Sequence, residues 1–201
     1  MKIAAKTFSY IFHPLLMPII GLLIVFNSNS YINFAIPVEL KQATLLLVAV
    51  STFVIPLIIT LLLLNRGHIS SLEMPTNRER ILPYGFTIIF YIFTIYMLKQ
   101  APIPQLIFDF MIGAVASVTL AFLINLKWKI SAHMIGIGGL TGALVCMTLL
   151  LETNMISFIV FAIIASGITA TSRLTLNAHT PHQLVAGYLL GISCQVIAIY
   201  L

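Results

Sequence analysis

The chain has 201 residues, of which 60% are hydrophobic and 7% are charged, and its formal net charge is +5 at pH 7. Soluble domains typically carry about 25% charged residues, so this composition excludes a water-soluble globular protein and predicts an integral membrane protein. The length suggests one domain, residues 1–201. The basic residues lie in short connectors without interleaved aromatics, which argues against nucleic acid and favours membrane surfaces or anionic head groups as partners.

Seven apolar stretches follow one another, and a helix needs about 20 apolar residues to cross a bilayer. The first is short and has His13-Pro14 near its start, so it either spans or forms an interfacial or re-entrant piece. Pro56 suggests a kink in the second. In chain order the stretches are Ile11–Phe26, Thr44–Leu64, Ile81–Leu98, Leu106–Leu126, Met134–Leu151, Met155–Thr171 and Leu184–Leu201.

These stretches are continuously apolar and lack the alternation of barrel strands. Backbone polar groups in lipid must be paired internally, so each stretch is expected to be a helix. The predicted fold is therefore an all-α, polytopic bundle of six to seven transmembrane helices. Cys146 and Cys194 lie inside apolar runs and predict neither a disulfide framework nor a zinc site.

Three connectors are the richest in Arg, His and Ser: Asn65–Arg80, Lys127–His133 and Ser172–Gln183. If all seven stretches cross, these connectors share one face. That face then carries eight Lys and Arg residues against two on the other, which would place it in the cytoplasm. If the first stretch does not cross, Lys2 and Lys6 change sides and the charge rule no longer decides.

The third connector carries Arg173 and, six positions on, His179. Arg offers a planar fork of donors for phosphate oxygens, and His acts as a nucleophile or proton carrier near neutral pH. The second connector ends on Ser131 and His133 at the start of a predicted helix. Free backbone N–H groups at such a position bind anions, and a His there can give a proton to a leaving oxygen.

The first connector adds Arg78 and Arg80 just before the Pro83 turn. The three connectors together supply cations, imidazoles and a hydroxyl on one face. This set suits an anionic phosphate ester, because cations hold the oxygens while one His attacks and another protonates the leaving group. The sequence shows no cluster of metal ligands, so neither a metal nor a cofactor is expected.

At these residues the chain resembles the type 2 phosphatidic acid phosphatase superfamily, which includes haloperoxidases. The third motif of that family is S-R-x5-H-x3-D followed by x3-G. Ser172, Arg173, His179 and Gly187 are in register with it, whereas Gln183 occupies the Asp position. The resemblance implies the helical fold of that family around the site.

The other two motifs match less completely. The second, P-S-G-H, reads I-S-A-H at residues 130–133, so the Ser and His match. In the first, K-x6-R-P, Arg80 takes the Arg position, Glu73 stands in place of the Lys, and Pro83 comes two residues late. The part of the chain that carries the motifs covers about residues 73–187.

The resemblance implies a role for each matched residue. His179 would attack phosphorus and form a phosphohistidine, while Arg173, Arg80 and the Ser131 hydroxyl hold the phosphoryl oxygens. His133 would protonate the leaving alcohol and then activate water. The products would be a lipid alcohol and inorganic phosphate, formed without a metal, and the lipid tail would enter through an opening between helices.

Where the chain departs from the family motifs, other groups would have to take over the roles of the missing Asp and Lys. We hypothesise that the Gln183 carbonyl accepts from the His179 ring N–H and fixes its tautomer, although it brings no charge. The cation lost at Glu73 would be replaced by Arg78, Lys127 or Lys129. A further candidate phosphate ligand is Ser172.

Several of these residues also have a purely structural interpretation. Arg78 and Arg80 could flank a helix and face head groups, and His133 could cap one. The run Lys127–Lys129 contains a Trp and is typical of an interface anchor. These alternatives would remove cations or an imidazole from the site.

The remaining unusual residues predict little function. The glycines of GIGGLTGA, residues 136–143, favour close helix packing over phosphate binding because they begin a turn after the second connector. His13 and His68 have no partner pattern. Asp109 lies early in its apolar stretch, which places it on the opposite membrane face.

Two function classes follow. The first is a metal-independent lipid phosphatase, a phosphoric monoester hydrolase that acts on a phosphate monoester or diphosphate of a membrane lipid in the bacterial inner membrane. The second is a non-catalytic family member that binds or transports phosphorylated lipids, with Glu73 and Gln183 marking lost chemistry. Both have the bilayer and a phosphorylated lipid as partners. The sequence predicts neither the identity of the lipid nor the oligomeric state.

Overall fold

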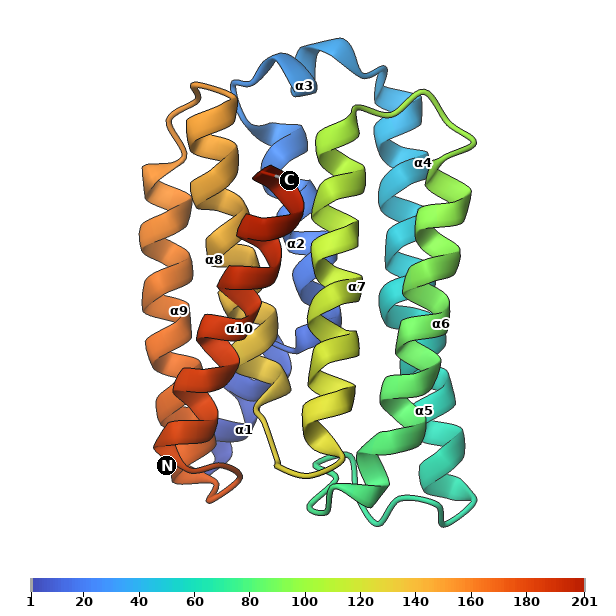
Figure 1. The fold of residues 1–201 in the computed structure, drawn as a ribbon, viewed down its shortest axis with the longest axis vertical. Coiled ribbons are helices and arrows are strands. Elements are labelled where there is room, and N and C mark those ends of the chain that lie inside the picture. The colour runs from blue at the N-terminus through green and yellow to red at the C-terminus, as the bar shows by residue number, and fades with distance from the viewer. Residues whose placement is uncertain (1, 201) are drawn as a thin grey trace.

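The computed structural model describes residues 2–200. Within this range the chain forms helices and no strand, and seven helical segments are long and apolar enough to cross a membrane (Figure 1). The predicted all-α, polytopic bundle is confirmed at this level, and the chain is an integral membrane protein. The expected last stretch, Leu184–Leu201, ends on a residue outside the described range.

The described residues form ten α-helices: nine in the seven segments, because two segments are interrupted, and one short helix in a connector. The boundaries of α6 coincide with the predicted stretch, whereas α9 extends past Thr171 and takes Ser172 and Arg173 into its last turn. The helices are α1 Lys2–Ile11, α2 Met17–Asn27, α3 Tyr31–Ala35, α4 Val38–Val48, α5 Ile55–Asn65, α6 Ile81–Leu98, α7 Gln105–Asn125, α8 Ala132–Leu150, α9 Ile156–Thr175 and α10 Pro181–Tyr200.

The first segment is a broken helix rather than one short stretch. Pro14 has no N–H and restricts the residue before it, so His13 is extended, with φ −66° and ψ 135°. A 3-10 turn, Pro14–Leu16, then leads into α2. α1 packs against α9 at the end where the N-terminus lies, and α2 continues to the opposite end (Figure 1). The segment therefore reaches both ends of the bundle.

The second segment contains a wide π-helical turn, Ala49–Val54, between α4 and α5. Pro56 lies just after it, and its ring clashes with the carbonyl four residues earlier while its missing N–H removes a helical bond. Such a local widening accommodates the proline without ending the helix. The irregularity predicted at Pro56 is therefore present as a π-helical turn.

The centre of the bundle is α8, which packs against α2, α7, α9 and α10. Its crossing with α10 depends on glycines: a Cβ on Gly138 would overlap the Tyr188 carbonyl, and a Cβ on Gly142 would lie 2.9 Å from the Ile192 Cα. Gly191 on α10 has the same relation to the Ile135 carbonyl. The packing role predicted for these α8 glycines is confirmed, and it holds the starts of α8 and α10 side by side.

The three polar connectors lie together at one end of the bundle. The α5–α6, α7–α8 and α9–α10 connections are all at the lower end in Figure 1, beside the N-terminus, while the C-terminal end of α10 points the other way. Each connection follows a helix that ends at this end, as seven crossings require. Residues separated by more than a hundred positions are thereby brought to one end of the bundle.

Candidate functional site

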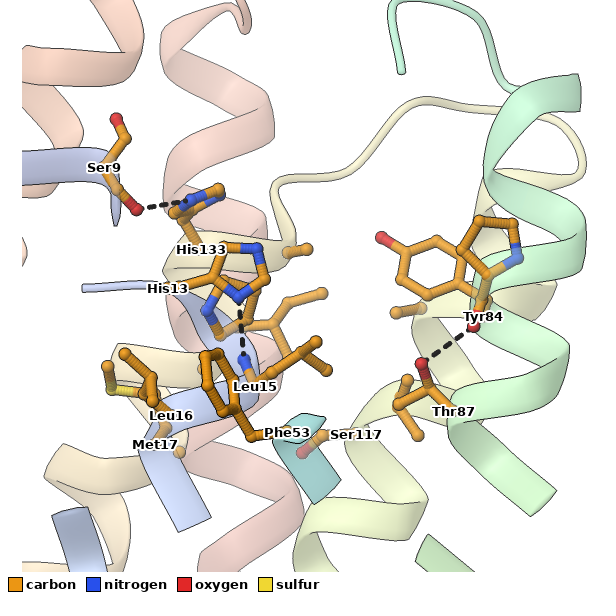
Figure 2. Close-up of a pocket in the computed structure, with 18 of the residues that line it drawn as sticks. Ser9, His13, Leu15, Leu16, Met17, Phe53, Tyr84, Thr87, Ser117 and His133 are labelled. Carbon is orange, nitrogen blue, oxygen red and sulfur yellow. Dashed lines mark hydrogen bonds between the residues drawn. The ribbon is translucent and has the colours of Figure 1, made fainter. Parts of the chain in front are cut away.

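A cavity of about 380 Å³ extends from this end into the bundle. Both halves of the broken first segment line it, together with residues of α5 to α10. Figure 2 shows His13 and His133 on one side of the cavity and Tyr84 on the other, with Ser117 farther along it. Its charged and imidazole side chains are Lys6, His13, Glu73, Arg80, His133, Arg173 and His179.

The imidazole of His179 is held by Gln183, one turn into α10. The His179 Nδ1 lies 3.0 Å from the Gln183 Oε1, and the Thr180 backbone N–H donates to the same oxygen at 3.2 Å. A backbone N–H can only donate, so the atom facing it is the amide oxygen, and His179 Nδ1 must carry a hydrogen to bond to it. The Nε2 lone pair of neutral His179 is therefore left free.

His179 is buried beside cations. The residue is 8% exposed in the α9–α10 connector. Burial, with charge repulsion from Arg80 and Arg173, lowers the pKa of His179 to about 3, while the bond to Gln183 acts in the opposite direction. The imidazole is consequently neutral at physiological pH, which is the form that can act as a nucleophile.

Arg173 is placed by the last turn of α9 and is 5% exposed. Its Nη1 donates to the Ser9 Oγ at 3.4 Å, a long hydrogen bond across to α1. Its buried Nε has no hydrogen-bond partner among residues 2–200. An arginine that lines a cavity with a free donor is suited to bind an anion.

Arg80 occupies the end of a 3-10 turn, Arg78–Arg80, just before α6. Its Nε donates to the Met74 carbonyl at 3.0 Å and its Nη1 to the Ile130 carbonyl at 3.1 Å. These bonds join two connectors and leave the Nη2 edge for a ligand. Arg78 is exposed and is not part of the cavity lining, so its phosphate contact stays a prediction that the cavity does not support.

His133 lies in the first turn of α8, and its Nε2 is 3.1 Å from the Ser9 backbone oxygen (Figure 2). Because a carbonyl oxygen only accepts, His133 donates through Nε2–H and keeps its other ring nitrogen free when neutral. The predicted proton donor therefore lines the cavity, but its Nε2 is tied to α1. Sequence reasoning did not anticipate that α1 contacts this histidine.

His13 is a site residue that sequence reasoning missed. Its ring lies edge-on to that of His133, with 5.6 Å between centroids. Its Nδ1 accepts the Leu15 N–H at 3.4 Å, so the hydrogen of the neutral ring is on Nε2 (Figure 2). The available signal was a histidine next to a proline inside an apolar stretch, because irregular backbone at membrane depth is tolerated where it lines a cavity.

Two predicted serine ligands lie outside the cavity lining. Ser131 is fully buried, and its Oγ accepts the Met134 N–H at 3.4 Å as the N-cap of α8. Ser172 donates to the Ile168 carbonyl at 2.8 Å and faces the groove between α1 and α9. Both hydroxyls satisfy helix backbone groups, so their expected phosphate contacts are not part of the site that we describe.

A cation from an unexpected element lines the mouth of the cavity. The Lys6 Nζ lies 3.7 Å from a Glu73 carboxylate oxygen, and both side chains belong to the cavity lining. Lys127 is exposed and outside this lining, whereas Lys129 donates to the Pro75 carbonyl at 3.1 Å and braces the α5–α6 connector. Burial lowers the pKa of Lys129, with Arg80 and Arg173 adding repulsion. Lys6 is thus the cation found beside Glu73.

The α5–α6 connector over the cavity mouth is folded around one carboxylate. Glu79 accepts from the Ser70 N–H and hydroxyl, both at 2.9 Å, and from the Thr76 hydroxyl at 2.8 Å. Asn125 at the end of α7 donates to the Asn77 carbonyl at 2.9 Å. These bonds give the connector that carries Glu73 and Arg80 a defined position.

No protein-family model, curated protein or solved structure matches the chain. Its function is accordingly argued from the cavity. Residues 2–200 contain no group of three or more His, Cys, Asp and Glu side chains arranged to hold a metal ion. The available chemistry is that of three imidazoles, two buried guanidiniums and one lysine around a cavity that continues into apolar surroundings.

Proposed function

We propose that this chain is an integral membrane lipid phosphatase that hydrolyses a phosphate monoester or diphosphate through a phosphohistidine, as a divergent member of the type 2 phosphatidic acid phosphatase superfamily. The observation that carries the proposal is the neutral, buried His179. Its Nδ1–H is fixed by Gln183, and it lines one cavity with Arg173 and Arg80. A cavity with cations at one end and apolar walls beyond suits a phosphate on a lipid.

In the first half-reaction the His179 Nε2 lone pair forms a bond to phosphorus, and the bond from phosphorus to the lipid oxygen breaks. Arg173 and the Nη2 edge of Arg80 hold the phosphoryl oxygens, since their positive charge stabilises the negative charge of the transition state. Gln183 keeps the hydrogen on Nδ1 and so keeps Nε2 unprotonated for attack.

The leaving lipid oxygen takes a proton from the His133–His13 pair when the two rings together hold one proton more than in their neutral forms, a state that the negative charge of the bound phosphate favours. Both imidazoles line the cavity and touch each other. His133 is the residue that the family resemblance assigns to this step, and it shares the second half-reaction, in which it accepts a proton from water that attacks the phosphohistidine. The water oxygen bonds to phosphorus, the bond to His179 breaks, and inorganic phosphate leaves.

The lipid tail reaches the site from the bilayer between α1 and α5. Leu57 and Thr60 of α5 line the cavity, as do Tyr10 of α1 and Leu72 of the following connector. Tyr10 is 58% exposed and Leu72 is 40% exposed, so the cavity wall continues to the outer surface of the bundle here. A lateral entry at this place keeps the hydrocarbon out of water while the phosphate enters.

The site is proposed to face the cytoplasm of a bacterial inner membrane. The end of the bundle with the three connectors carries Lys2, Lys6, Arg66, Arg78, Arg80, Lys127, Lys129 and Arg173, and the other end carries Lys41 and Lys99. Cations near the ends of transmembrane helices concentrate on the cytoplasmic side. Labelling of a single cysteine introduced at Arg66 from either side of sealed vesicles tests this orientation.

Phosphate release by the purified protein tests the proposed activity. A panel of phosphatidate, polyprenyl diphosphate and phosphorylated sphingoid lipids is offered to the wild type and to His179→Ala, with a chelator present. Release by the wild type that is lost in His179→Ala supports the proposal, and equal release by both rejects the nucleophile. Binding of these lipids without release by the wild type would favour a non-catalytic lipid binder, as the replaced Lys and Asp of the motifs also would.

A further inference from the structure

The cavity is lined by three polar side chains that the phosphatase mechanism does not use. Tyr84 comes from α6, Ser117 from α7 and Gln195 from α10. The Gln195 Oε1 is buried and has no hydrogen-bond partner within residues 2–200; the buried Tyr84 hydroxyl and Ser117 Oγ form no hydrogen bond of normal geometry there, although Tyr84 lies beside the Arg80 guanidinium. Ser117 lies beside the Cys194 thiol. Buried polar atoms are normally paired, so three unpaired ones on one cavity point to a ligand with polar groups.

The orientation of the Gln195 amide is fixed. Its Nε2 donates to the Phe110 carbonyl at 3.1 Å, so the opposite atom is the oxygen, which can only accept. Gln195 is 2% exposed. A Cβ on Gly113 would lie 2.6 Å from the Oε1, so only a glycine leaves room for the amide at this place. Gln195 thus belongs to the cavity lining, and its amide oxygen lies against Gly113 of α7.

Gln195 lies near Ser117, because its chain neighbour Cys194 is beside Ser117, and both residues lie away from the cations. Gly113, which contacts Gln195, is one turn before Ser117, so both face the same side of α7. Gln195 is 14 residues past the start of α10, about 21 Å along that helix. Ser117 is eight residues before the end of α7, about 12 Å along it. Their neighbours in the lining include Phe53, Tyr91, Phe110 and Leu140.

A plain hydrocarbon chain would fill this region but leave both polar atoms unpaired. A hydroxyl between them would donate to the Gln195 Oε1 and accept from the Ser117 Oγ–H, which satisfies both. An amide N–H would satisfy only the acceptor. The tyrosine hydroxyl, one turn past Arg80 on α6, is closer to the charged end and would contact the linkage next to the phosphate.

We propose that the cavity selects phosphorylated lipids that carry a hydroxyl in the middle of a hydrocarbon chain, with Gln195 accepting from it and Ser117 donating to it. The inference deepens the proposed function, on which it rests, because it names the class of lipid. It disfavours unsubstituted acyl chains and isoprenoids, whose chains offer no donor. Gln195 and Ser117 act in specificity and take no part in the phosphoryl transfer.

A pair of lipids tests the inference: phosphatidate with a mid-chain hydroxystearoyl group and the matched phosphatidate with stearoyl. Their dissociation constants are measured by native mass spectrometry or competition in the His179→Ala background, where no turnover occurs. We expect the hydroxylated lipid to bind about tenfold more tightly, as one buried hydrogen bond can provide. Gln195→Met and Ser117→Ala should each reduce this preference.

Thr87→Val is the matched control, since Thr87 lines the same cavity but its hydroxyl already donates to the Pro83 carbonyl at 2.8 Å. It should keep the preference. Equal affinity for the two lipids, including the case in which water alone bridges the polar atoms, would overturn the inference. A preference that survives both Gln195→Met and Ser117→Ala would also overturn it. Absence of phosphate release by the wild type rejects the phosphatase proposal but leaves this binding result intact.

Discussion

The two walls of the cavity are built differently. One wall comes from α8, α9 and α10 and carries His133, Arg173 and His179; the backbones of α8 and α10 touch at glycines. The other comes from α5, α6 and the connector between them, and carries Arg80 and Tyr84. Of the apolar stretch of α8, 67% is buried in the protein, against 22% for that of Val38–Asn65.

The difference in packing indicates that the two walls have different roles. Groups that must keep a fixed geometry lie on the tightly packed wall, where close helix contact restrains them. The loosely packed wall borders the proposed lipid entry and holds Arg80 by hydrogen bonds to the carbonyls of two connectors. Substitutions on the first wall should therefore affect folding and chemistry, and those on the second mainly access and binding.

The largest effect on stability is expected where α8 and α10 are in closest contact. In Gly191→Ala a methyl group would overlap the Ile135 carbonyl, which is backbone and cannot move aside. We expect the free energy of unfolding to fall by about 3 kcal/mol or more. The control is Gly167→Ala on the outer side of α9, where nothing lies within 4 Å, and it should be neutral or stabilising. Chemical unfolding in mixed micelles measures the free energy of unfolding of both variants. Equal losses of stability in the two would contradict the close packing of this wall.

Two arginine substitutions, one in the cavity and one on the surface, test which of these positions supports catalysis. Arg173→Ala removes a buried guanidinium from the phosphate end and should lower kcat about 100-fold to 1,000-fold, as loss of a transition-state donor typically does. Arg78→Ala removes an exposed guanidinium outside the cavity lining and should leave kcat unchanged. The measurement is steady-state phosphate release from the best lipid of the panel. A large loss in Arg78→Ala would restore it as a phosphate ligand.

The Gln183 amide should have an intermediate effect because it acts through His179. Gln183→Ala removes the acceptor for the Nδ1–H, and we expect kcat to fall about tenfold to 100-fold, the usual cost of losing an orienting partner. Gln183→Glu keeps the acceptor and should retain turnover, with a pH profile shifted by the added charge. If Gln183→Ala and Gln183→Asp both leave turnover and its pH profile unchanged, the orienting role is wrong.

The smallest expected effect is on how the chemical reactivity of His179 depends on pH. Since burial and the neighbouring arginines lower the pKa of His179 to about 3, its imidazole is neutral from about pH 5 to about pH 8, whereas an ordinary histidine protonates near pH 6.5. Its rate of modification by diethyl pyrocarbonate, which needs the neutral ring, should be nearly constant over this range. A histidine in a model peptide is the control, and a fall in step with it would contradict the lowered pKa.

The lowered pKa of His179 also makes the stability of the folded protein depend on pH. The unfolded chain takes up this proton near pH 6.5 and the folded chain only near pH 3, so protonation favours unfolding between these values. The contribution of His179 to stability therefore decreases as the pH falls from 6.5 towards 3 and is constant above 6.5. Unfolding of the wild type and of His179→Gln across this range checks the direction.

The sequence predicted the helices because the apolar composition and the length of a stretch are local properties. Ile81–Leu98 was predicted to the residue, and the seven segments were all found. The break in the first segment was less visible, although His13-Pro14 carried the signal. Its consequence, that α1 packs along α9 and brings Ser9 to His133 and Arg173, depends on packing between residues more than a hundred positions apart.

The candidate site, too, could be predicted only in part from the sequence. The motif spacing pointed to Arg173, His133 and His179, which share the cavity, and to the pairing of His179 with Gln183. It could not show that Ser131 and Ser172 use their hydroxyls on helix backbone, or that Lys6 approaches Glu73 from the N-terminal helix. Spacing along a chain fixes neither the direction of a side chain nor its partner in another helix.

The most direct test of the account is to trap the covalent intermediate. The protein is mixed with the lipid phosphate that it hydrolyses fastest, quenched within one turnover under alkaline conditions that preserve phosphohistidine, and its peptides are analysed by mass spectrometry. The account predicts a phosphoryl group on His179, absent from the exposed His182 in the same peptide region and absent from His179→Ala. Phosphate release by the wild type with no phosphoryl group on His179, or with one on another residue, would contradict it.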